Sequence, residues 1–160
     1  GDFAQAVAIW RPMAEARDPR AETYLGLMYD NGYGVAQDQA EAARWFERAA
    51  RRGWADAQFH LAFALHHGRG IKRSQTEALR WYEAAAAQGH QAAQYNLGRM
   101  YAHGLVVPRD LVVAWMWLER AGRQPSPMQP LARRDRDVVA ARMTPEELEA
   151  ARERLNGQSG

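Results

Sequence analysis

Four histidines stand where their side chains could do chemistry. His60, His66 and His67 lie close together in the chain, and His103 follows His67 by 36 residues. Neutral imidazole can ligate zinc, but every ligand must then lie within about 2 Å of the ion. Equivalent positions on neighbouring helices are separated by helix axes about 8–10 Å apart, which is too long for shared ligation. We therefore expect no metal site and interpret these histidines as polar surface residues.

Nucleophilic and phosphate-binding motifs are missing as well. The serines are Ser74, Ser126 and Ser159, and there is no cysteine, so disulfides and cysteine-ligated metals are excluded. The glycines of 68–70 lack the lysine and the strand that a phosphate-binding loop requires. We expect no catalytic residue and no cofactor, and interpret the protein as not an enzyme.

A period of 36 residues organises the elements that carry these side chains. Trp45, Trp81 and Trp117 stand exactly one period apart, and a column of alanines keeps the same register. The alanines of this column are Ala6, Ala42, Ala78 and Ala114. A fixed period of this length marks a repeat array, in which one unit must stack on its neighbours to bury its apolar face. We expect the three tryptophans to be core residues.

Each period predicts two helices joined by a glycine turn. In the middle period, apolar residues at helical spacing predict a helix over 56–67, and Gly68 ends it because glycine readily adopts the left-handed conformation. Ser74 with Glu77 forms a capping box that starts the second helix, which we expect to run to about Gln88. The same cap column holds Asp2, Asp38 and Asp110.

One period carries a recognisable pattern in full. It reads Tyr24-Leu25-Gly26-Leu27-Met28-Tyr29-Asp30-Asn31-Gly32-Tyr33-Gly34-Val35, followed by Asp38, Ala42, Trp45-Phe46, Ala49-Ala50 and Gly53. This pattern resembles the Sel1-like repeat, a longer relative of the tetratricopeptide repeat. The resemblance implies an all-α fold, a right-handed α-solenoid of helix-turn-helix repeats with a C-terminal helical cap, in a bacterial protein.

The register and the resemblance together suggest a division of the chain. The expected segments are 1–17 (second helix of a partial leading repeat), 18–53, 54–89 and 90–122 (Sel1-like repeats), and 123–160 (a proline-rich turn and the cap). In the last segment, Thr144-Pro145-Glu146-Glu147 is a strong helix start, and 156–160 should fray.

The resemblance also suggests where a partner would bind. In this architecture the non-core face of each first helix lines a concave groove, and its residues here are of types that are common in recognition surfaces. The expected groove residues are Tyr24, Leu27, Asn31, His60, Phe63, His67, Asn96, Arg99 and His103.

These residues favour a non-enzymatic adaptor or scaffold that holds a protein or peptide in the groove. One alternative is a hydrolase or carbohydrate-binding protein acting on cell-wall-derived compounds, although the relatives with such activity resemble a disulfide-rich branch and this chain has no cysteine. Another alternative is a purely structural segment of a larger protein, whose other parts fill the groove.

Charge and hydropathy argue against two classes of partner. Lys plus Arg number 21 and Asp plus Glu 19, a formal charge of +2. The arginines within 133–137 alternate with aspartates, which predicts a solvated helix face rather than a nucleic-acid site. No apolar run reaches the roughly 18 residues of a membrane span. We expect the periplasm or the cytoplasm of a bacterium, with the periplasm favoured.

Overall fold

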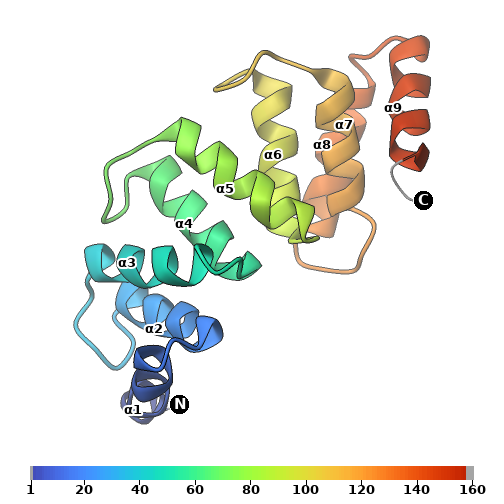
Figure 1. Ribbon diagram of the computed structural model, residues 1–160. Helices are drawn as coiled ribbons and strands as arrows, with labels where there is room; N and C mark the ends of the chain where they lie inside the picture. Colours follow the sequence, from blue (N-terminus) through green and yellow to red (C-terminus); the bar gives the residue numbers. More distant parts are fainter. Residues whose placement is uncertain (1, 158–160) are drawn as a thin grey trace. The chain divides into compact units, whose positions relative to one another are not determined.

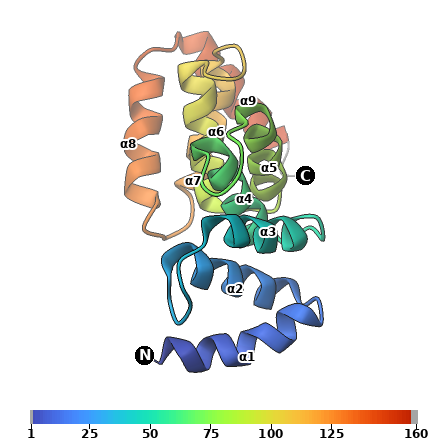
Figure 2. The same ribbon diagram turned by 90° about the vertical axis from the view of Figure 1, so that its left-hand side faces the viewer.

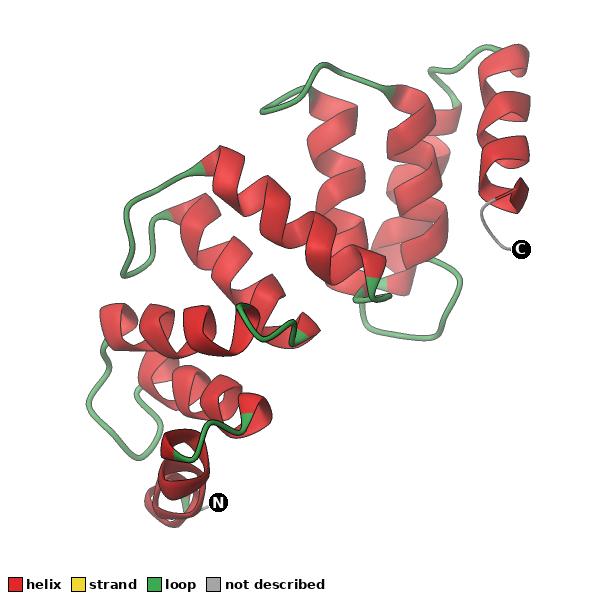
Figure 3. Ribbon diagram, in the orientation of Figure 1, coloured by secondary structure: helices red, strands yellow, loops and turns green. Residues whose placement is uncertain are grey.

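A computed structural model describes residues 2–157, and all regular structure within that range is helical (Figures 1 and 3). The helices are α1 (Phe3–Glu15), α2 (Pro19–Asn31), α3 (Gln39–Ala50), α4 (Ala55–His67), α5 (Gln75–Ala87), α6 (Gln91–His103), α7 (Leu111–Ala121), α8 (Gln129–Ala140) and α9 (Pro145–Gly157). They form two compact units, unit 1 (Gly1–Gln88) with α1–α5 and unit 2 (Gly89–Gly160) with α6–α9.

The predicted helix starts are confirmed by their hydrogen bonds. The Asp38 carboxylate accepts from the Glu41 amide at 2.9 Å, and the Ser74 hydroxyl accepts from the Glu77 amide at 3.4 Å. At the start of α9 the bonds are reciprocal: Glu147 donates its amide to the Thr144 hydroxyl at 3.2 Å, and the Thr144 amide donates to the Glu147 carboxylate at 2.9 Å. These bonds satisfy amides that the first turn of a helix would otherwise leave unpaired.

The chain end differs in part from the expectation. Asn156 and Gly157 belong to α9 rather than fraying, while 158–160 lie outside the described residues.

Two glycines in each turn of unit 1 have separate tasks. Gly68 ends α4 in the left-handed conformation, with φ at 73°. Gly70 also has a positive φ, 66°, and a Cβ built on it would lie 2.0 Å from the Gln39 carbonyl oxygen. A Cβ built on Gly34 would likewise lie 2.4 Å from the Phe3 carbonyl oxygen. The second turn glycine therefore lets the turn backbone contact the start of the preceding repeat's second helix.

Unit 1 is a stack of neighbouring helices. Each of its helices packs on the next one in the chain, and Figure 2 shows α1, α2 and α3 as successive layers. Leu25 and Trp45 belong to the core between them. Gly26 keeps this contact close, because a Cβ there would lie 2.6 Å from the Phe46 ring. Small residues at such crossings let the two helix axes approach.

Unit 2 is built around α7. This helix packs against α6, α8 and α9, and its residues Trp115, Met116 and Leu118 share a core with Val139 of α8 and Leu155 of α9. The apolar face of the last helix pair is therefore covered by the two C-terminal helices (Figure 1).

The recurring tryptophans are not equally buried. Trp45 is 7% exposed, but Trp81 and Trp117 are only half-buried, so the expectation that all three are core residues was wrong for two of them. Arginine takes part in covering this column: the guanidinium of Arg48 lies 4.3 Å from the ring centre of Trp45, and that of Arg120 lies 4.9 Å from that of Trp117. Both distances are within the range of cation–π contacts, in which the guanidinium lies over the ring face.

A column of buried polar residues also follows the 36-residue period. Glu22, Gln58 and Gln94 are all buried near the start of the first helix of a repeat. Glu22 forms ion pairs with Arg48 and Arg52, and Gln58 accepts a hydrogen bond of 2.8 Å from Gln88. Buried polar groups need such partners, so this column fixes how helices of unit 1 meet.

Candidate partner-binding surface

The predicted groove residues of α2 are partly exposed, and one of them, Tyr24, is aromatic. Tyr24 is 44% exposed, and its ring packs against that of Trp10 with centroids 4.7 Å apart. Leu27 is half-buried, and Asn31 is exposed and donates a hydrogen bond to the Leu27 carbonyl at 2.9 Å. Tyr24 is therefore the exposed aromatic side chain among the three.

The predicted residues of α4 are more enclosed. The His60 ring stacks on Phe46 of α3 with centroids 5.0 Å apart. Phe63 is half-buried, and the ring of His67 lies 4.3 Å away from it, centroid to centroid. These contacts fix the orientation of Phe63 and leave only part of its ring for a ligand.

Arg69 encloses Phe63 further. Its guanidinium lies 5.7 Å from the Phe63 ring centre and forms a 3.1 Å ion pair with Asp30 at the end of α2. The pair ties the turn after α4 to the neighbouring repeat. In unit 1 the predicted residues therefore take part in inter-repeat packing as well as in the surface.

In unit 2, the structure brings two predicted residues into one cleft. Arg99 and His103 of α6 are exposed and line a cleft of 320 Å³ between α6 and α8. The third predicted residue, Asn96, is half-buried and is not part of the cleft lining. Helix α8 contributes Arg134, Asp135, Val138 and Val139 to the lining, and Arg142 comes from the turn after α8.

Asp135 is fully engaged at the edge of this cleft. It accepts a hydrogen bond from the Tyr95 hydroxyl at 2.9 Å, and Arg134 donates to it from Nε and Nη2 at 3.0 and 2.9 Å. Burial, followed by the hydrogen bond to Asp135, raises the pKa of Tyr95 above its ordinary value. The same carboxylate raises the pKa of Arg134 through their hydrogen bonds.

The other cations of the cleft have no such partner. Among residues 2–157, the side chains of His103 and Arg142 make no hydrogen bond or ion pair, and Arg99 has only its guanidinium 5.7 Å from the Tyr95 ring centre. Three arginines against one aspartate leave this cleft with a formal charge of +2 when His103 is neutral.

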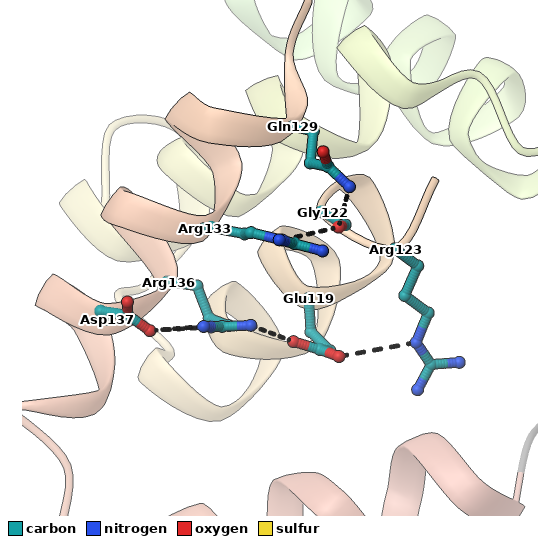
Figure 4. A network of polar contacts seen from close by, with 7 residues as sticks. All are labelled: Glu119, Gly122, Arg123, Gln129, Arg133, Arg136 and Asp137. Atoms are coloured by element: carbon teal, nitrogen blue, oxygen red, sulfur yellow. Dashed lines mark hydrogen bonds and ion pairs between the residues drawn. The ribbon is translucent and has the colours of Figure 1, made fainter. Parts of the chain in front are cut away.

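The α8 side of the cleft was missed by the sequence analysis. The alternating charges of 133–137 were expected to form a solvated face, but several of them are engaged in the fold. Figure 4 shows Arg136 bound to Glu119 of α7 at 2.8 Å and Arg133 donating to the Gly122 carbonyl at 3.2 Å. A usable signal was present for two of these residues, since positions 134 and 138 are four residues apart and share one face of α8, whereas Arg142 follows the helix end at Ala140.

The described part of the chain offers no alternative site of a metalloenzyme type. Within residues 2–157 no three or more histidine, aspartate or glutamate side chains are placed to hold a metal ion together. None of the helices there has the length and apolar character needed to cross a membrane.

Comparison with known proteins agrees with the repeat pattern. The family model for the Sel1 repeat matches residues 19–54, 55–90 and 91–126. Among curated proteins, none matches the chain. The fold is similar to the crystal structure of a protective antigen present in uropathogenic Escherichia coli strains and displaying an SLR fold, with a TM-score of 0.86 and 35% identity over 96% of this chain.

A second similar structure is that of a Sel1 repeat protein from Oxalobacter formigenes, with a TM-score of 0.67 and 31% identity over 74% of this chain. The chain spans 32% of the length of the first of these proteins and 51% of the second. With three consecutive repeats matched and helix pairs at the predicted period, this chain is an all-α solenoid protein that belongs to the Sel1 repeat family.

Proposed function

We propose that this chain is a non-enzymatic module that binds a protein or peptide through the exposed faces of its first helices. Sel1 repeats commonly mediate protein–protein interactions, and the family is typically non-catalytic. The proposal adds where on this chain a partner is held.

One observation supports the proposal above the others. The cleft between α6 and α8 combines an exposed apolar side chain, Val138 at 57% exposure, with exposed Arg99, His103 and Arg142. Ligand-binding sites commonly combine an apolar contact with a few polar groups around it, as this cleft does. Arginine is also among the residues that most often dominate binding energy at interfaces.

In unit 1, two aromatic groups form a second part of the proposed surface. Tyr24 is exposed, and Phe63 is half-buried beside His67. Aromatic side chains already held by neighbours lose little conformational freedom on binding, which favours them as anchors. We assign them a contact role that is separate from that of the cleft.

The test is a selection of random peptides displayed on phage against the whole chain, followed by calorimetry of the enriched peptides. Replacing Arg99 or Phe63 by alanine should weaken at least one enriched peptide by about 1–3 kcal/mol, the range of interface anchors. Helical circular dichroism should stay unchanged. Arg154→Ala is the matched control, since Arg154 is exposed on α9 and outside the cleft. Failure to enrich any peptide, or equal binding by all variants, would reject the proposed surface.

A further inference from the structure

We infer that the cleft between α6 and α8 selects acidic segments of a partner polypeptide, with Arg99 and Arg142 holding an Asp or Glu side chain and Val138 contacting an apolar neighbour. The inference rests on the proposed function and specifies the chemistry of the ligand.

Two arginines of the cleft keep their hydrogen-bond donors unused among residues 2–157. A guanidinium carries five N–H donors in a rigid fork that matches a carboxylate. Arg99 and Arg142 use none of theirs in a hydrogen bond or ion pair within residues 2–157. Arg99 is also placed over the Tyr95 ring, a contact that orients its guanidinium beside the cleft. Its donors therefore remain available to a ligand.

The charges of the cleft disfavour a basic segment. Asp135 is the one acidic residue of the lining, and both of its oxygens are occupied by Tyr95 and Arg134. A lysine of a ligand would compete with Arg134 and Tyr95 for this carboxylate, and it would be repelled by Arg99 and Arg142 of the same lining. The cleft is therefore favourable to a negative charge and unfavourable to a positive one.

The cleft also offers an apolar contact beside its cations. Val138 lies on the same face of α8 as Arg134, and Arg142 follows in the turn after α8. Leu118 and Val139 are buried at the base of the cleft. A volume of 320 Å³ lies at the lower end of ligand sites, so it accommodates a few side chains rather than a whole folded partner.

The experiment uses three amidated, fluorescein-labelled peptides that differ at two positions around one central leucine. These two positions carry glutamate, glutamine or lysine. Binding to the whole chain is followed by fluorescence anisotropy and by the methyl resonances of Val138. The glutamate peptide should bind about tenfold more tightly than the glutamine peptide and lose affinity as salt is raised, because exposed charge pairs are screened. The lysine peptide should not bind.

Matched variants locate the effect. Arg99→Gln and Arg142→Gln should each weaken the glutamate peptide by about fivefold or more, as expected for loss of a charge-assisted contact. Arg154→Gln removes the same charge from an exposed position on α9. It should change binding less than twofold, because salt screens the interaction between distant exposed charges. Equal effects of the three variants would overturn the assignment to this cleft.

The remaining outcomes separate this inference from the proposed function. If the glutamine and glutamate peptides bind equally and both shift Val138, acidic selection is wrong while peptide binding stands. A fourth peptide, the glutamine peptide with a free C-terminal carboxylate, is measured beside the three amidated ones. If it binds best, the acidic group is a chain end, and the assignment to side chains is wrong. If none of the peptides shifts Val138, both the inference and the cleft as a binding site are rejected.

Discussion

Glu22 is a charged residue that is completely buried, and its partners explain why it is tolerated. Its carboxylate pairs with Arg48 Nε at 3.0 Å and with Arg52, so two cations from the end of α3 and the turn after it meet one anion on α2. The 36-residue alignment with Gln58 and Gln94 could have revealed a polar core column, but not that its first member is paired with two arginines.

Replacing Glu22 by alanine should be strongly destabilising. Glu22→Ala removes the contacts with Arg48 and Arg52, which are 43% and 33% exposed, and hydrogen bonds to charged groups contribute about 1.5–3 kcal/mol. The free energy of unfolding from urea titration measures the loss. Glu47→Ala is the control, because the Glu47–Arg51 pair is 41% and 71% exposed and should contribute no more than about 1 kcal/mol. Equal losses for the two variants would contradict the structural role of Glu22.

Tyr95 should make the fold sensitive to alkaline pH. Burial and the hydrogen bond to Asp135 raise its pKa above the ordinary 10.0, so the folded state holds the phenol proton more tightly than the unfolded chain. Its contribution to stability is therefore complete below pH 10.0 and is lost as the pH rises through the folded-state pKa. Tyr95→Phe should lower stability at neutral pH and flatten its decline above about pH 10.

Thermal melts at a series of pH values test this linkage. Tyr33→Phe serves as the control, since Tyr33 is 46% exposed in the turn after α2 and stacks on Phe3, a contact that phenylalanine preserves. If the Tyr95→Phe and Tyr33→Phe proteins lose stability in parallel with the parent above pH 10, Tyr95 is not the group responsible.

At the scale of elements, local signals were sufficient for helices and turns. Ser74 with Glu77 and Thr144 with Glu147 start helices where predicted, because capping depends on residues three positions apart. The 320 Å³ cleft was not predictable, because it depends on how α8 packs beside α6. Arg99 and His103 were recognised from their repeat columns, whereas Arg142 lies after the last repeat and has no column to compare.

The second turn glycine of the middle repeat gives an element-scale prediction. Gly70→Ala should lower the stability of the fold more than Gly53→Ala. Both positions have a positive φ, which costs a non-glycine residue about 1–2 kcal/mol, but only at Gly70 would the new Cβ meet backbone, 2.0 Å from Gln39. Around Gly53 there is open space. Urea titrations should show an additional loss of about 1–3 kcal/mol for Gly70→Ala, typical of overpacking. Equal losses would show that the α3 start moves away at little cost.

At the scale of the whole molecule, the apolar side of a repeat array must end somewhere. We propose that α8 and α9 are the C-terminal cap, since Val139 and Leu155 cover Trp115, Met116 and Leu118 of α7. Terminal repeats of solenoids need such a covering element with a polar outer face. The 36-residue spacing predicted the repeats. The cap has no equivalent in that spacing, so its contacts with α7 could be found only from the packed structure.

Deleting residues 125–160 should therefore cause self-association. The deletion would expose the α7 residues that are now buried, and apolar patches of several hundred Å² promote association. Light scattering should show a concentration-dependent rise in mass, and the melting temperature should fall. Leu155→Ala is the milder comparison and should destabilise by about 2–5 kcal/mol, as is usual for a buried leucine. A truncated chain that stays monomeric with an unchanged melting temperature would refute the cap.

The second turn glycine also bears on how such an array can lengthen by duplication. Gly34 and Gly70 share their place in successive repeats with Val106, and among residues 2–157 the one non-glycine with a positive φ is Arg17. A tandem copy of the third repeat inserted between the first two would bring a valine side chain to the site where the turn backbone now contacts the start of α3. At this turn, a copy of the first or second repeat would keep the glycine that the contact with α3 requires, and we expect a copy of the third repeat to fit less well there.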